Sequence, residues 1–543
     1  MVSSNSKPGM GLFQLLPPEL RNYAFSCLGR NALTSLRATC STLERIVPSN
    51  IDRVFISANS RNIQVFRAIA DSEKHRHNVT EIIWDDARLS EGPEYPVESD
   101  LIDYDYEAYD PVTTNGCPRW FTMRCVDGGV GFEKHCPPET SMGLEESWDY
   151  YKALLEDQRG IMQSNADIET FKYGLQRFTH LKRVTITPST HGRIGQPMFR
   201  TPMIRSFPPG FDYPLPRPWP YFALDSPNED VPWVFDENRT NTDDDGLNMS
   251  ASEHEEYRCK WRGFRVVMRA LVECERDHHV TELIIGGREM MTGVNCHVFD
   301  QRCQEYDDLV SLLRRPGFRR LDLDLNTFFL ERDSVGWKSY RSGLLHEALT
   351  QAKDLRHLSL RTTTATDEGD CWLIGLGKDP EKVFPLEIIL PFGQWSNLQH
   401  FGISNMLVTQ SDLISLLVAL PQSLRSTELS HLGFAGGSWW GLLNEMRAKL
   451  DWRMRLMEER PIVHMAVATL DETCELGFYA DLDDAVESFL YGSGMNPFRE
   501  PSDWLGMEAK CVDSIPRGTV GIQRDFFDPC FSAPYEFIST SER

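Results

Sequence analysis

The chain has 543 residues, which is more than one ordinary hydrophobic core holds, so we expect one elongated domain or two to three compact ones. Hydrophobic residues make up 41% of the sequence and aromatic residues 11%, a composition that excludes a fibrous or wholly disordered chain. The formal net charge of -24 argues against a general affinity for nucleic acid or anionic membranes, because both bind basic surfaces.

Targeting signals are absent from the sequence. It has no run of about 18 apolar residues, and its start lacks the apolar core of a signal peptide. We therefore expect an intracellular protein, in the cytoplasm, the nucleus or both, without a membrane partner. The 13 cysteines are scattered, and in a reducing compartment most of them should be buried free thiols.

The first fifty residues are basic, with five basic and two acidic side chains. Pro18 fits the first turn of a helix, and Gly29 ends it. Asn31 predicts the N-cap of a second helix, and a capping box of Ser41 and Glu44 predicts a third. Three such short helices bury little surface, so the unit either docks on a partner or packs on the following body as an N-terminal cap.

Residues 15–47 read LLPPELRNYAFSCLGRNALTSLRATCSTLERIV and resemble the F-box, in particular that of F-box proteins of filamentous fungi. In that family a Leu-Pro-x-Glu motif opens three helices that bind the Skp adaptor, which tethers the protein to a cullin ubiquitin ligase. The resemblance implies an F-box domain over residues 11–50. It also implies that nine residues bind the adaptor: Leu16, Pro17, Leu20, Phe25, Leu28, Leu33, Leu36, Cys40 and Leu43.

Downstream, one short pattern recurs: an apolar residue, two polar residues and an alternating apolar strand. The copies are IDRVFI, VTEIIW, LKRVTI, VTELII, FRRLDLDLN, LRHLSL, LQHFGI and LRSTEL, and they start at Ile51, Val79, Leu181, Val280, Phe318, Leu355, Leu398 and Leu424. Apolar residues at helical spacing lie between several copies. Strands that alternate with helices predict a parallel sheet and an α/β fold.

The copy FRRLDLDLN contains Leu-x-Leu-x-x-Asn and resembles the degenerate leucine-rich repeats common behind F-boxes. This resemblance implies an irregular leucine-rich-repeat-like α/β solenoid with inserted loops over residues 51–460. Later copies start 38, 37, 43 and 26 residues apart, which is not a regular period. An unrelated α/β fold with short parallel strands therefore stays open as the alternative.

Two insertions interrupt the pattern. The first covers residues 85–143, and its part 85–110 holds ten acids and one Arg, which fits a solvated loop or an acidic docking site for a basic partner. The second, residues 188–235, holds eleven prolines and several aromatic residues, so we expect an ordered, packed segment. Residues 236–256 lack apolar content and are expected to form a flexible acidic loop.

Residues 438–461 predict one long amphipathic helix, and IVHMAV after it predicts a strand. We expect residues 461–543 to form a C-terminal capping region. It contains LYGSGMNPF, which is similar to a segment near the end of many fungal F-box proteins.

Motifs of enzymatic chemistry are missing, since the sequence has no P-loop, no His-Glu-x-x-His and no nucleophile elbow. Cys117, Cys125, His135 and Cys136 lack the paired spacing of a zinc site, so scattered structural residues are the preferred interpretation. A pair of histidines, His278 and His279, precedes a strand and is expected to face solvent. We therefore expect no catalytic residue, no cofactor and no metal.

Together these observations predict an F-box substrate receptor that binds the Skp adaptor and recruits a protein target to a cullin ubiquitin ligase for ubiquitination. Such a receptor needs no catalytic residue, because it contributes proximity and orientation. The alternative is a scaffold protein that retains an F-box and forms no ligase, and a third possibility is an enzyme with an unrecognised site. The target stays unnamed, and we expect no nucleic-acid partner.

Overall fold

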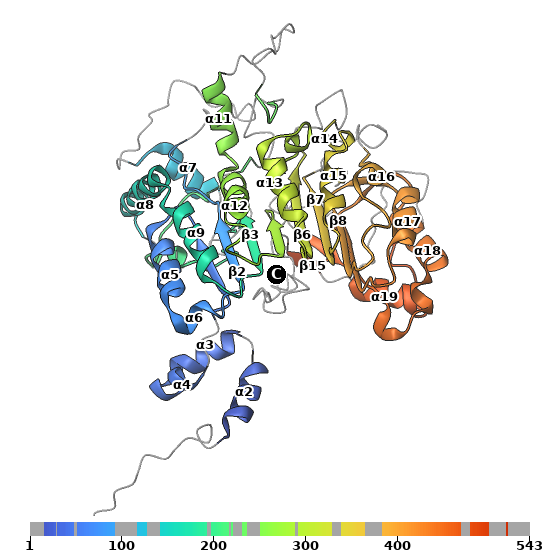
Figure 1. Ribbon diagram of the computed structural model, residues 1–543, viewed down its shortest axis with the longest axis horizontal. Coiled ribbons are helices and arrows are strands. Elements are labelled where there is room, and N and C mark those ends of the chain that lie inside the picture. Colours follow the sequence, from blue (N-terminus) through green and yellow to red (C-terminus); the bar gives the residue numbers. More distant parts are fainter. Residues whose placement is uncertain are drawn as a thin grey trace, which may run out of the picture.

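The computed structural model describes residues 16–28, 30–47, 51–92, 117–127, 142–192, 197–216, 219–220, 231–235, 250–287, 292–327, 338–363, 383–468, 478–498 and 517–519. It is an α/β structure built on one ten-stranded sheet (Figure 1). None of the helices in these ranges is long and apolar enough to cross a membrane.

The strands of this sheet follow one another in chain order. They are β1 (Arg53–Ile56), β2 (Glu81–Asp85), β3 (Arg183–Thr187), β4 (Glu282–Ile285), β6 (Arg320–Asn326), β7 (His357–Thr362), β8 (His400–Ser404), β10 (Ser426–Ser430) and β12 (Ile462–His464). All neighbours in this series pair in parallel, and β5 (Val294–Asn295) pairs with the end of β6. Each copy of the recurring pattern supplies one strand, so the predicted parallel sheet is confirmed.

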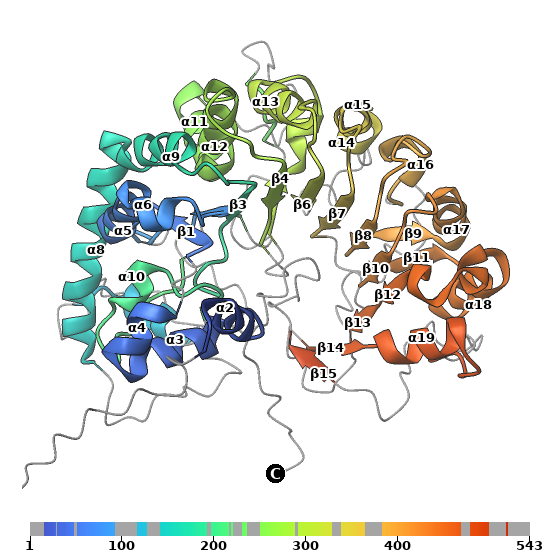
Figure 2. The ribbon, with the colours of Figure 1, turned by 60° about the horizontal axis from the view of Figure 1, so that its bottom comes forward.

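Most helices of the body lie along the outer side of the sheet, which curves into an arch (Figure 2). The helices of the body are α5 (Ser60–Asp71), α6 (Glu73–Arg76), α7 (Arg119–Asp127), α8 (Leu144–Ser164), α9 (Ala166–Arg177), α10 (Pro202–Arg205), α11 (Ala251–Cys259), α12 (Arg262–Glu273), α13 (Gln304–Leu313), α14 (Lys338–Arg341), α15 (Leu344–Gln351), α16 (Leu386–Ile389), α17 (Gln410–Ala419), α18 (Trp439–Lys449) and α19 (Asp483–Tyr491). A short 3-10 helix, η4 (Cys296–Phe299), precedes α13.

Alternation along each strand divides its side chains between the two faces of the sheet. In β6, Leu321, Leu323 and Leu325 are buried in the apolar core. The intervening Asp322 and Asp324 project from the opposite face, since successive side chains of a strand alternate. One continuous apolar core therefore lies between sheet and helices. The other face carries mainly polar residues, with a small apolar cluster of Ile83 and Phe199 at β2.

Two successive strands leave the sheet through the same turn. Asn405 after β8 and His431 after β10 both have positive φ, at 55° and 51°. The next residues form β9 (Leu407–Thr409) and β11 (Gly433–Gly436), which pair in parallel. Asn405 and His431 thus occupy the same position in two neighbouring strand-and-turn units.

The predicted strand IVHMAV is divided by Met465. Its first part is β12, and its second part is β13 (Ala466–Ala468), which starts an antiparallel sheet with β14 (Phe478–Asp481) and β15 (Arg517–Thr519). Met465 N–H donates to Asp483 Oδ1 at 2.9 Å, and this bond replaces the sheet contact at the break.

The long helix expected over 438–461 is wrong beyond Lys449. Leu450 has an extended backbone, and two 3-10 turns follow, η8 (Asp451–Met454) and η9 (Met457–Glu459). In a continued helix the side chain of Trp452 would point about 240° around the axis from that of Met446, which is buried. Because the helix ends early, the side chain of Trp452 is buried as well as that of Met446.

The flexible loop expected over 236–256 is wrong at its end, because α11 begins at Ala251; residues 236–249 lie outside the described ranges. Ser250 Oγ accepts from Glu253 N at 3.3 Å, and Glu253 Oε2 accepts from Ser250 N at 2.7 Å. This Ser-x-x-Glu capping box in the sequence indicates the start of a helix within an otherwise acidic segment.

Candidate functional site

Three short helices precede the body: α2 (Pro18–Ser26), α3 (Arg30–Thr39) and α4 (Ser41–Ile46). Figure 1 shows them below the sheet, next to α6. Burial, Lys74 and Arg37 lower the pKa of His75 on α6, so α3 and α6 are close enough to interact electrostatically. The helices therefore lie at the end of the body where the first strands begin.

The caps of these helices differ from the sequence prediction. Helix α3 already begins at Arg30, so Asn31 lies in its first turn. Cys40 is the N-cap of α4, and its side chain makes no capping hydrogen bond. Ser41 is thus the first helical residue, and the side chain of Glu44, the other half of the predicted capping box, lies outside the described part of the structure. Gly29 lies outside the described residues.

Apolar side chains at the start of α2 and on the helix itself are exposed. The exposed fractions are 37% for Leu16, 55% for Leu20 and 71% for Tyr23. Leu20 and Tyr23 are three residues apart and share one side of α2, and Leu16 lies just before the N-cap Pro17. We call these three residues the α2 face.

Other predicted adaptor-binding residues are distributed between surface and interior. Pro17, Leu28 and Cys40 are exposed, whereas Leu33, Leu36 and Leu43 are half-buried. Phe25 is only 2% exposed. Its side chain is therefore packed inside the free protein and is not available at the surface.

A row of polar side chains crosses the body on the sheet face turned away from the helices. Strand register places eight polar residues and one apolar residue side by side: Arg53, Glu81, Arg183, Glu282, Arg320, His357, His400, Ser426 and, last, Ile462. We call them the charged row. Its charges alternate in sign over the first five strands, and its members from Arg320 to Ser426 are buried.

Neighbours in the charged row form ion pairs across strands. Arg53 Nε lies 2.5 Å from Glu81 Oε2, and Arg183 Nε lies 2.8 Å from Glu282 Oε2. Burial alone would raise the pKa of Glu81, but Arg53, Arg183 and a hydrogen bond from Thr185 lower it to about 2. These carboxylates are held ionised, which suits a structural role rather than proton transfer.

Histidines continue the charged row. The rings of His357 and His400 stack with centroids 4.2 Å apart. His357 Nε2 lies 3.0 Å from Asp322 Oδ1, and His400 Nδ1 lies 2.6 Å from Ser426 Oγ. Burial and the charge of His357 lower the pKa of His400 well below its usual range, so His400 is neutral at pH 7.

Sequence reasoning missed the charged row, although a signal for it was present. Each of its first eight members is the second polar residue in a copy of the recurring pattern. Aligning the copies by their strands gives the series Arg, Glu, Arg, Glu, Arg, His, His, Ser. A column of alternating charges predicts ion pairs between adjacent strands.

A second buried cluster lies where β2 and β3 end. Asp85 is 2% exposed, and burial raises its pKa to about 7. His191 is 3% exposed, burial lowers its pKa to about 3, and its Nδ1 lies 2.8 Å from the Tyr213 hydroxyl. Asp85 Oδ2 and His191 Nε2 have no hydrogen-bond partner among the described residues. Between about pH 3 and 7, both groups are therefore neutral in the folded chain.

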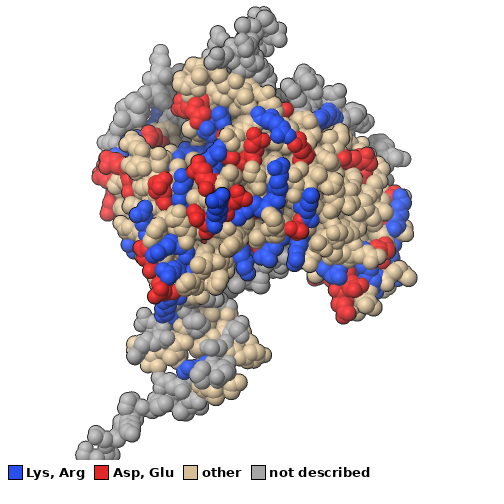
Figure 3. Space-filling view, in the orientation of Figure 1, with Lys and Arg blue, Asp and Glu red and all other residues tan. Residues whose placement is uncertain are grey.

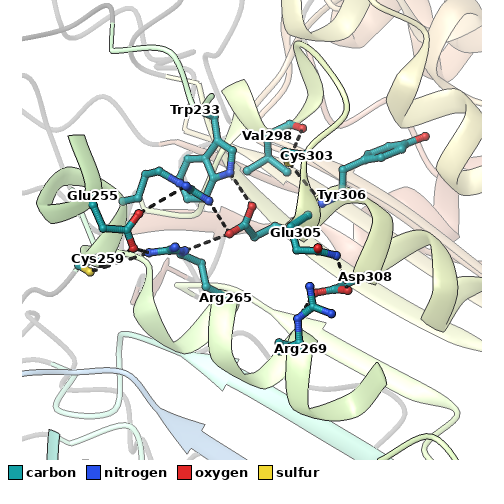
Figure 4. A network of polar contacts seen from close by, with 12 residues as sticks. Trp233, Glu255, Cys259, Arg265, Arg269, Val298, Cys303, Glu305, Tyr306 and Asp308 are labelled. Atoms are coloured by element: carbon teal, nitrogen blue, oxygen red, sulfur yellow. Dashed lines mark hydrogen bonds and ion pairs between the residues drawn. The ribbon is translucent and has the colours of Figure 1, made fainter. Parts of the chain in front are cut away.

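Figure 4 shows a polar network around Glu305 that joins α11, α12 and α13. Trp233 Nε1 donates to Glu305 Oε2 at 3.0 Å, while Arg258 and Arg265 lie 2.6 and 3.0 Å from Glu305 Oε1. Arg265 also pairs with Glu255 at 2.7 Å. Both oxygens of Glu305 are thus engaged, and the network ties three helices together.

His278 contradicts its predicted exposure. It is 2% exposed, and its Nε2 lies 2.9 Å from Leu271 O while Val280 N–H donates to its Nδ1. The ring therefore bridges the end of α12 to β4, whereas His279 is exposed.

Cys117 and Cys125 are buried thiols, and His135 and Cys136 lie outside the described ranges. Within those ranges, no group of three or more His, Cys, Asp or Glu side chains could hold a metal ion.

The sequence matches no protein-family model and no curated protein.

Proposed function

We propose that this chain is an F-box substrate receptor. Its N-terminal helices would bind the Skp adaptor, and its body would bind a protein target for ubiquitination by a cullin ligase. The observation that carries the proposal is the exposed α2 face, Leu16, Leu20 and Tyr23, within a sequence that resembles the F-box. A partner that covers these side chains gains hydrophobic stabilisation, and large exposed apolar residues are typical anchors of an interface.

The arrangement of the body supports the leucine-rich-repeat-like part of the proposal. Its strands follow chain order, and the turns at Asn405 and His431 repeat. Stacked repeats produce such an arrangement, because each unit mainly contacts its neighbours. Solenoids present extended surfaces, which suits a protein that holds another protein.

The test is co-purification of the Skp adaptor with the full chain. Changing Leu16→Ala together with Pro17→Ala should abolish recovery of the adaptor, because both residues are exposed at the start of the α2 face. The thermal midpoint should stay unchanged for the same reason. A matched control is Met454→Ala with Met457→Ala, which removes two apolar side chains of the body that are 87% and 84% exposed.

Undiminished adaptor recovery by the Leu16 and Pro17 variant contradicts the proposal. Recovery of the adaptor without any cullin favours the alternative, a scaffold that forms no ligase. A cullin in the same complex, together with a protein that accumulates when this chain is deleted, supports the receptor.

A further inference from the structure

A second row of residues runs along the edge of the sheet where the strands begin. It consists of the residue directly before each of the first eight members of the charged row, from Asp52 before β1 to Arg425 before β10. Four of these residues are basic: Lys182, Arg319, Arg356 and Arg425. We call these four the basic rim.

Backbone hydrogen bonds hold the basic rim in register. Arg356 N–H donates to Arg319 O at 2.8 Å, Gln399 N–H donates to Arg356 O at 2.7 Å, and Arg425 N–H donates to Gln399 O at 2.8 Å. Consecutive positions are therefore one strand apart, or about 4.8 Å. From β3 to β10 the order β3-β4-β6-β7-β8-β10 makes the rim about 24 Å long.

The cations of the basic rim are largely not neutralised. Lys182, Arg356 and Arg425 are exposed, and none of them has a carboxylate within ion-pair distance in the described part of the chain. The Arg425 guanidinium donates to the carbonyls of Gln422 and Leu424 at 2.8 and 3.0 Å. Within the described ranges, Arg319 alone of the four pairs with a carboxylate, that of Glu282 at 2.6 Å.

This rim is a local feature of an acidic protein. The whole chain carries -24, yet Lys and Arg gather toward the lower border of the body in Figure 3. A charged strip of this length attracts an oppositely charged ligand over several ångströms and orients it.

We infer that the basic rim binds an acidic, extended segment of another polypeptide. An extended chain advances about 3.4 Å per residue, so about seven residues would span the rim. Acidic side chains at every second or third position of such a segment would meet cations that are one or two strands apart. A protein segment fits better than nucleic acid, because the rest of the chain repels a polyanion with one charge per residue.

The basic rim lies at the same end of the body as the N-terminal helices. Helix α6 leads into β2 at this edge, and Figure 1 shows the N-terminal helix α3 next to α6. A bound segment would therefore lie on the side where the adaptor is proposed to dock. The inference rests on the proposed function only in identifying that segment as part of a ligase target.

The experiment is fluorescence anisotropy of the full chain with a labelled peptide of about eight residues that has Glu at every second position and Ser between. The rim variant is Arg356→Glu with Arg425→Glu. Its matched control is Arg61→Glu with Arg200→Glu, two exposed residues outside the basic rim, in the segments that follow β1 and β3. Both pairs change the net charge equally. The dissociation constant should rise about tenfold in the rim variant and less than about twofold in the control, since reversal replaces attraction by repulsion.

Equal weakening in both variants would overturn the inference, because it would show a general charge effect. Tighter binding of a single-stranded oligonucleotide of the same length would overturn the assignment to a polypeptide. Adaptor co-purification separates the two proposals. If the rim variant binds the peptide as wild type does and the chain still recovers the adaptor, the rim inference alone is rejected. If the wild-type chain binds the peptide through the rim but recovers no adaptor, the proposed function alone is rejected.

Discussion

The N-terminal helices and the body distribute their side chains in opposite ways. On α2, Leu20 and Tyr23 are 55% and 71% exposed, whereas in the body Glu81 and Asp85 are 5% and 2% exposed. A unit of three short helices is too small to cover its own apolar residues, so some of them stay exposed. The body is large enough to bury charges, and it pairs them across strands at the cost of their hydration. The comparison separates an exposed apolar surface from an interior of paired charges that fixes the fold.

The largest expected effect is in the charged row. Glu81→Ala leaves the Arg53 guanidinium without the carboxylate that lies 2.5 Å away, so the free energy of unfolding should fall by about 3–5 kcal/mol. Urea denaturation measures this loss. The Glu81→Gln variant keeps the shape and should lose less.

Acid should reproduce part of this loss in the wild type. Because the pKa of Glu81 is lowered from 4.5 to about 2, its stabilisation is complete above pH 4.5 and is lost as the pH falls toward 2. If the free energy of unfolding of Glu81→Ala falls by less than about 1 kcal/mol, the loss of this carboxylate does not leave a costly unpaired charge in the charged row.

The next effect concerns Asp85 and His191, whose pKa values shift in opposite directions. Burial raises the pKa of Asp85 from 3.8 to about 7, so its contribution to stability is lost as the pH rises between these values. Burial lowers the pKa of His191 from 6.5 to about 3, so its contribution is lost as the pH falls between these values. Over the shared range the two slopes cancel in the wild type.

Single substitutions should reveal how each group makes the free energy of unfolding depend on pH. Relative to wild type, the stability of Asp85→Asn should rise with pH from about 4 to 6.5, and that of His191→Gln should fall, each by up to about 1.4 kcal/mol per pH unit. Chemical denaturation at several pH values measures both slopes. Parallel curves for wild type and both variants would show that neither group titrates as its burial requires.

The smallest effect is expected on the α2 face. Leu20→Ser changes a side chain that is 55% exposed, so the free energy of unfolding should change by less than about 0.5 kcal/mol. The same denaturation assay provides the measurement. A loss above about 1 kcal/mol would indicate that this side chain packs on the body, and the contrast between the two regions would disappear.

The strands, the helix expected over 438–461 and Phe25 show which features the sequence predicts correctly. All eight copies of the recurring pattern became strands, because alternation is a local property that the residues themselves carry. The expected helix over 438–461 failed at Leu450, because burial of Trp452 by the body outweighed local helical preference. Phe25 matches the F-box pattern but is packed inside the free protein, and pattern matching does not distinguish buried from exposed positions.

The sequence by itself determined the strands, the alternation of their faces, the basic character of the first fifty residues and the resemblance to the F-box. Only the tertiary structure decided which polar residues meet. Arg53 and Glu81 are 28 positions apart, and Arg183 and Glu282 are 99 apart, yet parallel register makes both pairs neighbours. The same register aligns the basic rim. The physical reason is that backbone hydrogen bonding fixes strands at about 4.8 Å whatever the length of chain between them.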